Sequence, residues 1–237
     1  MKIIQIIGLI LFSSTGSICQ NLSFTEVRDS IQSIMLKDDI PGLSIAIINK
    51  SDSLYWAGGF GFGDIENAKP MTAHTTMYIA SVSKNFLAMA MMILVERGQV
   101  RLSDNISSII PEVNIKNMWS DASPITVEMV LEHTTGFDDI RFNNFIAPDS
   151  EYLPLLEILN KYPNALESRW QPGTLFSYSN LNYTVAGYII EKVSGRRFED
   201  FVQDEILNPL KMSETRVRDF TQKTDSISIP YVYNFDT

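Results

Sequence analysis

The tetrapeptide Ser81-Val-Ser-Lys84 places a serine and a lysine three positions apart. On a helix, residues i and i+3 share a face, so the Lys84 amine can approach the Ser81 hydroxyl. A serine hydroxyl is a poor nucleophile until a base takes its proton, and apolar surroundings favour the neutral form of a lysine amine. The spacing therefore indicates a nucleophilic Ser-Lys pair. About one such match is expected by chance in a chain of this length, so other motifs must support it.

A second group of reactive side chains is the tripeptide Tyr178-Ser-Asn180. A lysine ammonium beside a phenol favours the phenolate, so Tyr178 could exchange a proton with the serine or with a leaving group. The amide of Asn180 could hold a substrate carbonyl. The tripeptide Tyr162-Pro-Asn164 has the same Tyr-x-Asn pattern. Its central proline and different flanking residues favour a plain loop there.

Histidine and paired-carboxylate chemistry has weaker support. A Ser-His-Asp relay would need His74 or His133, and no motif brings either to a serine, so we interpret His133 as structural. Asp138 and Asp139 are adjacent, and neighbouring side chains point apart. We therefore expect this pair to lie in a solvated loop.

Several classes of protein are excluded by what the sequence lacks. With Cys19 as the only cysteine and two histidines, the chain cannot assemble a Cys/His zinc site. It contains no G-x-S-x-G elbow and no D-[ST]-G motif of aspartic proteases. The Gly58–Gly63 stretch lacks the spacing of a nucleotide-binding loop, and we interpret it as a bend in a strand. We expect neither a metal nor an organic cofactor.

The composition is that of a globular protein. The 237 residues are 45% hydrophobic and 20% charged, enough to bury a core in one or two domains. The formal net charge is −9, and the adjacent pair Arg196-Arg197 is the longest basic run. A nucleic-acid partner is therefore not expected.

The first 19 residues have the pattern of a secretory signal peptide. Lys2 precedes a short apolar run over 3–12, which is too short to span a bilayer. Ser17 and Cys19 suit the −3 and −1 positions of a cut before Gln20. We expect a secreted or periplasmic protein without a transmembrane span. The alternative is a lipoprotein acylated at Cys19, which is disfavoured because Ile18 stands where a lipobox needs a small residue.

The mature chain is expected to begin with a helix and a hairpin. Ser23 and Glu26 form a capping box ahead of apolar residues at helical spacing, which predicts a helix ending near Lys37. Two β-rich segments, 43–49 and 54–57, flank a turn-like stretch at 50–53. They predict a β-hairpin.

The rest of the chain is expected to be mainly helical. The segment from Ser81 to Arg97 is apolar nearly all round and stops at Gly98, which predicts a buried helix with a glycine C-cap. Its methionines Met89, Met91 and Met92 are interpreted as core filling. Further helices are predicted over 126–132, 151–161, 180–193 and 198–207, and a return to β-structure over 227–233.

Seven segments occur in an order that resembles the serine β-lactamase-related family, which contains class C β-lactamases, D-alanyl-D-alanine carboxypeptidases and related esterases. They are Pro41–Ile48, Phe60–Gly63, Ile79–Lys84, Leu131–Gly136, Pro172–Asn180, Ile189–Gly195 and Pro209–Met212. The resemblance implies an α+β fold, an antiparallel sheet flanked by helices with an inserted all-helical subdomain. It places a first α/β part at 20–79, the helical subdomain at 80–214, and the start of the return to the α/β part at 215–237.

The resemblance also implies roles for the motif residues. Ser81 would be the acylated nucleophile, Lys84 and Tyr178 the shared proton-transfer system, and Asn180 a substrate contact. The backbone N–H of Ser81 would be the first oxyanion donor.

One family feature is not found in this sequence. Members carry a third motif, K-T-G or H-x-G, on a strand far beyond the tyrosine motif, and Lys223-Thr-Asp225 lacks the glycine and comes too early. We expect the chain to be the N-terminal portion of a longer protein, with the C-terminal strands beyond Thr237.

Together these observations predict a secreted serine hydrolase that acts on amide, β-lactam or ester bonds in a small-molecule or peptide substrate. The alternative is a non-catalytic, penicillin-binding-like or structural domain of the same fold. The choice of substrate depends on loops whose shape the sequence does not specify.

Overall fold

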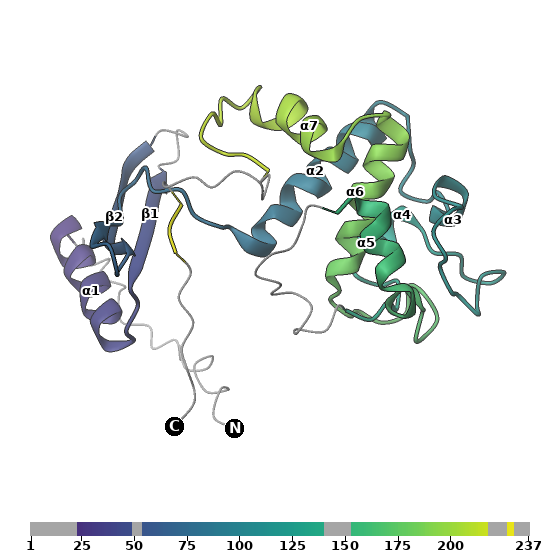
Figure 1. Cartoon of the computed structure of the whole chain (residues 1–237), viewed down its shortest axis with the longest axis horizontal. Helices are drawn as coiled ribbons and strands as arrows, with labels where there is room; N and C mark the ends of the chain where they lie inside the picture. Colours follow the sequence, from purple (N-terminus) through teal and green to yellow (C-terminus); the bar gives the residue numbers. More distant parts are fainter. Residues whose placement is uncertain (1–22, 49–53, 140–152, 218–226, 230–237) are drawn as a thin grey trace, which may run out of the picture. The chain divides into compact units, whose positions relative to one another are not determined.

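A computed structural model describes residues 23–48, 54–139, 153–217 and 227–229, and they fall into two compact units (Figure 1). Described residues up to Thr75, with Ser228 and Ile229, form the first, here called the sheet unit. Described residues from Thr76 to Ile227 form the second, the helical unit. The expected signal peptide, the hairpin turn at 50–53 and residues 230–233 of the last predicted strand lie outside the described residues. The domain boundaries expected at 79 and 214 stay predictions.

The sheet unit begins with helix α1, Phe24–Lys37, as the capping box predicts. The Ser23 hydroxyl accepts a hydrogen bond from the Glu26 N–H, and the Glu26 carboxylate accepts one from the Ser23 N–H at 2.7 Å. Two of the helix's first-turn donors are thus satisfied. Met35 is buried, and Phe24 packs edge-to-face on Trp56 with ring centroids 4.9 Å apart.

The predicted hairpin is present, and its second strand is longer than expected. Strands β1, Gly42–Ile48, and β2, Leu54–Asp64, are antiparallel, and β3, Lys69–Pro70, pairs with the other edge of β2. The glycine-rich stretch lies within β2. Gly61 has a φ of +68°, and a Cβ there would lie 2.2 Å from the carbonyl oxygen of Pro41. Glycine thus permits a local turn of the strand, as the sequence suggests, instead of forming a nucleotide loop.

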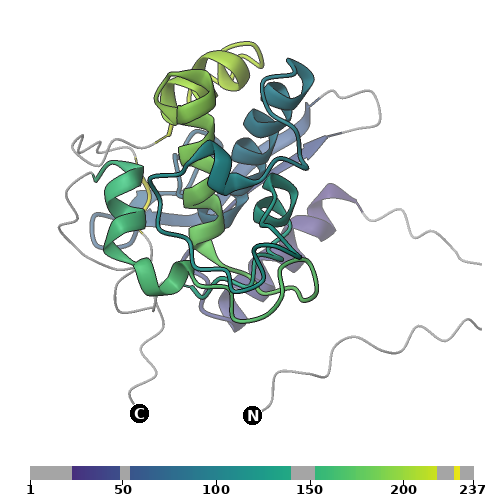
Figure 2. The same cartoon turned by 90° about the vertical axis from the view of Figure 1, so that its right-hand side faces the viewer.

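The helical unit contains the long helices α2, Ser83–Glu96, and α6, Asn180–Ser194, which pack against each other. The shorter elements are α3, Ile106–Ile109; α4, Val127–Leu131; α5, Leu155–Lys161; α7, Phe198–Val202; the 3₁₀ turns η1, Ala80–Val82, and η3, Pro163–Leu166; and the π turn η4, Gln203–Leu207. Helix α6 lies in the middle of this unit and also packs against α4 and α5 (Figure 2).

A single core holds these helices together. Leu94 of α2, Val130 of α4, Leu159 of α5 and Ile189 of α6 are fully buried in one apolar cluster. Each buried aliphatic side chain of this size contributes roughly 1.5–3 kcal/mol relative to exposure. The core gives α2 a fixed place, and α2 carries Lys84.

Two predictions for the segment 81–97 are wrong in part. The helix begins at Ser83, and Ser81 lies in the preceding 3₁₀ turn. Met91 is fully buried, but Met89 and Met92 are 45% and 46% exposed, so the methionines are not all core residues. The reason is geometric, because α2 meets α6, α7 and η4, which cannot cover its whole circumference. Gly98, with a φ of +67°, follows the helix end as expected.

The remaining helix predictions agree with the structure within a few residues. Helix α5 begins at Leu155 instead of Glu151, which lies outside the described residues. Helix α6 ends at Ser194, where Gly195 takes a left-handed conformation with a φ of +69°. Ile227 makes one isolated bridge to Thr76, and residues 228 and 229 are in no strand, so the described residues show only this bridge of the strand predicted over 227–233. Among the described residues, no helix has the length and apolar character needed to cross a membrane.

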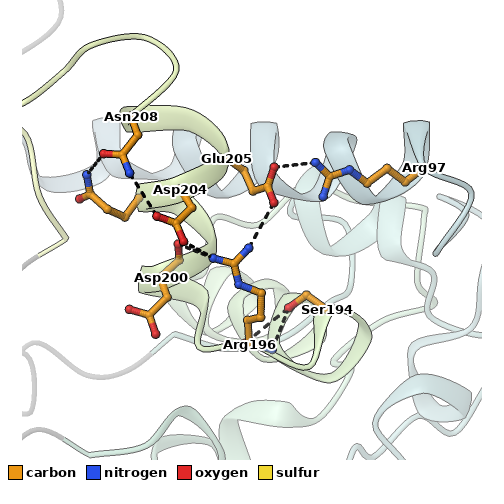
Figure 3. A network of polar contacts seen from close by, with 8 residues as sticks. Arg97, Ser194, Arg196, Asp200, Asp204, Glu205 and Asn208 are labelled. Carbon is orange, nitrogen blue, oxygen red and sulfur yellow. Dashed lines mark hydrogen bonds and ion pairs between the residues drawn. The ribbon is translucent and has the colours of Figure 1, made fainter.

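The C-terminal end of α2 is tied to the segment after α6 by an ion-pair network, here called the arginine cluster (Figure 3). Arg97 pairs with Glu205 of η4, and Arg196 pairs with the same carboxylate at 3.2 Å and with Asp204. The Arg196 guanidinium also donates to the backbone oxygen of Asp200. Each guanidinium therefore finds a carboxylate partner at this end of the helix.

Candidate active site

The backbone immediately before Ser81 has an unusual conformation. Ala80 has a φ of +44°, in the left-handed region that residues with a Cβ rarely adopt. Such a conformation costs on the order of 1–3 kcal/mol and persists only where the surrounding structure holds it. It places Ser81 in the exposed turn just before α2.

The structure brings together the four residues that the sequence singles out. The Ser81 Oγ lies 2.6 Å from the Tyr178 Oη, although the two residues are 97 positions apart. The Lys84 ammonium donates to the Ser81 Oγ at 3.2 Å and to the Asn180 Oδ1 at 2.7 Å. Ser81 is exposed, Lys84 and Asn180 are half-buried, and Tyr178 is 42% exposed. The Ser81 hydroxyl thus contacts both a phenol and an ammonium and remains accessible to solvent.

Tyr178 and Asn180 are held by the loop that precedes α6. The Ser177 N–H donates to the His133 carbonyl at 2.8 Å, and the Ser179 hydroxyl donates to the Asp138 carbonyl at 2.8 Å. Asn180 is the first residue of α6, so its position is fixed by a helix whose buried residues, from Leu181 to Ile190, begin directly after it. These bonds aim the phenol and the amide at the N-terminal end of α2.

His133 supports this loop and makes no contact with the Ser81 hydroxyl in the hydrogen bonds described. Its buried ring lies 4.5 Å from the Tyr178 ring, centroid to centroid. Its Nδ1 faces two donors, the Ser179 N–H at 3.2 Å and the Asn182 amide at 3.3 Å, so Nδ1 acts as the acceptor. Burial, and then the charge of Lys84, lowers the pKa of His133. The neutral ring is therefore a support for Tyr178, in line with the structural interpretation.

The electrostatic environment favours the phenolate of Tyr178. Burial alone would raise the pKa of Tyr178, but hydrogen bonding to Lys84 and Ser81 and the charge of Lys84 outweigh it, so the pKa is lowered. The Lys84 ammonium lies 4.8 Å from the Tyr178 ring centroid and 5.5 Å from that of Tyr183. By contrast, burial and the charge of Tyr178 raise the pKa of Tyr183. Of these two tyrosines beside the lysine, Tyr178 is the one suited to accept a proton.

The sequence analysis missed a contact made by Asp139. Asp139 is half-buried, and its carboxylate accepts from the Asn180 N–H at 2.8 Å and from the Asn180 side-chain amide at 3.0 Å. The expectation of a solvated pair holds for Asp138, which is exposed and pairs with Arg169 at 3.2 Å, but it is wrong for Asp139. No local signal could have revealed this contact, because its partners are 41 positions apart.

Tyr162, in the competing tripeptide, has a different environment. It lies between α5 and η3 and packs, partly buried, against the helical core. This agrees with its interpretation as part of a loop. No group of three or more potential metal ligands occurs among the described residues.

Comparison with known proteins relates this site to a family. The model of the Beta-lactamase family matches residues 27–225. Protein flp of Staphylococcus aureus strain MW2 is 28% identical over 215 residues, which are 89% of this chain and 42% of that protein. The unguisins hydrolase ungD' of Aspergillus campestris is 27% identical over 82% of this chain and 37% of its own length. This chain therefore spans less than half the length of these curated relatives.

Solved structures resemble this one over most of the chain. The octameric penicillin-binding protein homologue from Pyrococcus abyssi has a TM-score of 0.76 and 27% identity, over 90% of this chain and 49% of that one. The D-amino acid amidase from Ochrobactrum anthropi SV3 has a TM-score of 0.65 and 26% identity, over 79% of this chain and 52% of that one. EstCE1, a hydrolase with promiscuous acyltransferase activity, has a TM-score of 0.68 and 26% identity, over 78% of this chain and 50% of that one.

Proposed function

The chain belongs to the Beta-lactamase family, and from this premise we propose that it is a serine hydrolase working through an acyl-serine intermediate. The predicted family and its α+β, β-lactamase/transpeptidase-like fold are confirmed by the family match and the solved relatives. Relatives named as an amidase and as hydrolases support a hydrolase in general terms. The finer proposal concerns the mechanism.

One observation carries this proposal, the position of the Ser81 hydroxyl between Tyr178 and Lys84. With Tyr178 as phenolate, the Ser81 proton passes along the 2.6 Å contact to the phenol oxygen as Oγ attacks the substrate carbonyl. The Lys84 ammonium stays beside both oxygens and stabilises negative charge as it moves from one to the other. The backbone N–H of Ser81, in the first turn of η1, would be one donor to the resulting oxyanion.

The second half of the cycle uses the same groups in reverse. Collapse of the tetrahedral intermediate breaks the bond to the leaving amine or alcohol, which takes the proton held by Tyr178 and leaves an acyl ester on Ser81. Water then attacks this ester and gives a proton to Tyr178, and the acid product departs with the Ser81 oxygen reprotonated. In this scheme the chain's own side chains carry out each proton transfer.

The proposed substrates contain an amide, a β-lactam or an ester. The names of the relatives include an amidase, a penicillin-binding protein homologue and a hydrolase with acyltransferase activity, which supports this range for a peptide or small-molecule substrate. The pattern of residues 1–19 supports secretion or a periplasmic location, with acylation of Cys19 as the alternative.

Covalent labelling tests the proposal. The full-length protein should form an adduct with a fluorophosphonate, mapped by mass spectrometry to the peptide carrying Ser81. The matched variants are Ser81→Ala, which should abolish labelling, and Ser83→Ala, which should retain it. Labelling at Ser83 or Ser179 would overturn the assignment. A stable adduct with fluorescent penicillin and no hydrolysis of amide or ester substrates would instead favour the non-catalytic, penicillin-binding alternative.

A further inference from the structure

We propose that Asp139 is a positioning residue of this site, whose carboxylate sets the orientation of the Asn180 amide and, through it, the position of Lys84 beside Ser81. The inference rests on the proposed acyl-serine mechanism and adds to it a residue outside the two sequence motifs. Its basis is a chain of direct contacts from Asp139 to Asn180 and from Asn180 to Lys84.

The chemistry of the two contacts leaves the Asn180 amide one orientation. An ionised carboxylate only accepts hydrogen bonds and a lysine ammonium only donates them. The amide nitrogen must therefore face Asp139, at 3.0 Å, and the amide oxygen must face Lys84, at 2.7 Å. Rotating the amide by half a turn would set its oxygen against the carboxylate and its N–H groups against the ammonium, so both contacts would become repulsive.

Asp139 is itself held in place by the segment before it. Phe137 is fully buried, and the Arg169 guanidinium donates to its carbonyl at 2.9 Å. The neighbouring Asp138 carbonyl accepts from the Ser179 hydroxyl at 2.8 Å. The Asn180 N–H also donates to the Asp139 carboxylate at 2.8 Å, which fixes the carboxylate to the first residue of α6. The orienting group is thus part of a rigid assembly, as a positioning role requires.

The consequence concerns Lys84. Its stem comes from α2, whereas one acceptor for its ammonium is an amide on α6. If that amide turns, Lys84 loses its 2.7 Å contact and is free to leave its place 3.2 Å from the Ser81 Oγ. The electrostatic stabilisation that Lys84 gives to the Ser81 and Tyr178 oxygens depends strongly on such distances, so we expect the acylation step to slow.

The test compares Asp139→Asn with the matched variant Asp121→Asn, at an exposed aspartate outside the site, in the full-length protein by burst kinetics with a nitrophenyl ester. Asp139→Asn should slow acylation by about ten- to a hundredfold, the range for a misplaced catalytic group. Asp121→Asn should acylate within about twofold of wild type. Acylation of Asp139→Asn at the wild-type rate, or a loss equal to that in Asp121→Asn, would overturn the proposal.

A double-mutant cycle separates positioning from a general loss of structure. If Asp139 acts through Asn180, adding Asp139→Asn to Asn180→Ala should change the acylation rate by less than about twofold. The same loss in both backgrounds would refute the route through Asn180. Should Asp139→Asn fail to fold, Asp139→Glu must acylate faster than Asp139→Gln, and equal rates would refute the role of the carboxylate. Absence of any wild-type label at Ser81 would instead overturn the proposed function and this inference with it.

Discussion

The two ends of helix α2 both carry polar networks, and the networks differ in how their charges are matched. At the C-terminal end, Arg97 and Arg196 share the carboxylate of Glu205, and Arg196 also pairs with Asp204 (Figure 3). At the N-terminal end, the Lys84 ammonium donates instead to a hydroxyl and an amide. Ion pairs neutralise the first network, whereas the second keeps a positive charge directed at the Ser81 hydroxyl.

The backbone follows the same division. At the C-terminal end of α2, the residue with a left-handed backbone conformation is Gly98, which has no Cβ and is therefore not strained. Where Ser81 is presented, the left-handed residue is Ala80, and His133 beside Tyr178 also has a positive φ. Strained backbone of this kind persists only where the surrounding structure holds it, and it concentrates at functional sites. The comparison predicts that the N-terminal network serves activity and the arginine cluster serves stability.

The largest expected effect is on activity at the N-terminal end. Replacing Lys84 by Ala, or Tyr178 by Phe, should slow acylation of Ser81 by on the order of a hundredfold or more, because the first change removes the charge that stabilises the reacting oxygens and the second removes the proposed base. The melting temperature should stay near that of the wild type. Stopped-flow acylation and thermal unfolding of the same preparations check both expectations. Tyr162→Phe is the matched control, and a larger loss there than at Tyr178 would show that the motif assignment is wrong.

A second effect is a shift of the pH–rate profile. In the proposed mechanism the active form of Tyr178 is the phenolate, so acylation should rise with pH through the pKa of Tyr178, which lies below its ordinary value of 10.0. Lys84 is one cause of that lowering, so in Lys84→Ala the midpoint should move to higher pH. The profiles are measured as acylation rate against pH for the two proteins. A midpoint that stays in place in the variant contradicts the assignment of Tyr178 as the base.

A smaller effect, on stability alone, is expected at the arginine cluster. Arg196→Ala removes two ion pairs and a hydrogen bond to the Asp200 carbonyl, and it should lower the free energy of unfolding by about 1 kcal/mol. Acylation should be unchanged. Arg101, which pairs with Asp104 three residues along the chain and whose side chain is 81% exposed, provides the control, and Arg101→Ala should have a smaller effect. A loss of acylation in Arg196→Ala with normal stability would contradict the assignment of activity to the N-terminal end of α2 and of stability to its C-terminal end.

The smallest effect is the acid dependence of the same cluster. Hydrogen bonding from Arg97 lowers the pKa of Glu205 below its ordinary value of 4.5. The stability this carboxylate contributes is fully present above pH 4.5 and is lost as the pH falls through the lower folded pKa. Glu205→Gln should therefore reduce the fall in melting temperature below pH 4.5. The acylation rate near neutral pH should not change. If the melting temperature of Glu205→Gln falls with pH as steeply as that of the wild type, Glu205 does not contribute to the acid dependence of stability.

Much of the local structure could be predicted from sequence, and both candidate motifs could be recognised there, because they depend on near neighbours. The capping box of Ser23 and Glu26 predicts the start of α1, and Gly98 and Gly195 mark where α2 and α6 end. The Ser81–Lys84 spacing already implies a shared face. These signals act over three or four residues, through hydrogen bonds and side-chain geometry that any chain of this sequence would offer.

Tertiary structure alone decided which distant groups meet. The contact of Ser81 with Tyr178 joins residues 97 positions apart, and the hydrogen bond from Asn180 to Asp139 joins residues 41 positions apart. It also decided that Met91 is buried while Met89 is exposed, since burial depends on which neighbours pack against α2. Sequence by itself therefore determined the chemical groups and their local frames, whereas packing of α6 against α2 determined their distances, because no local interaction reaches across such separations in the chain.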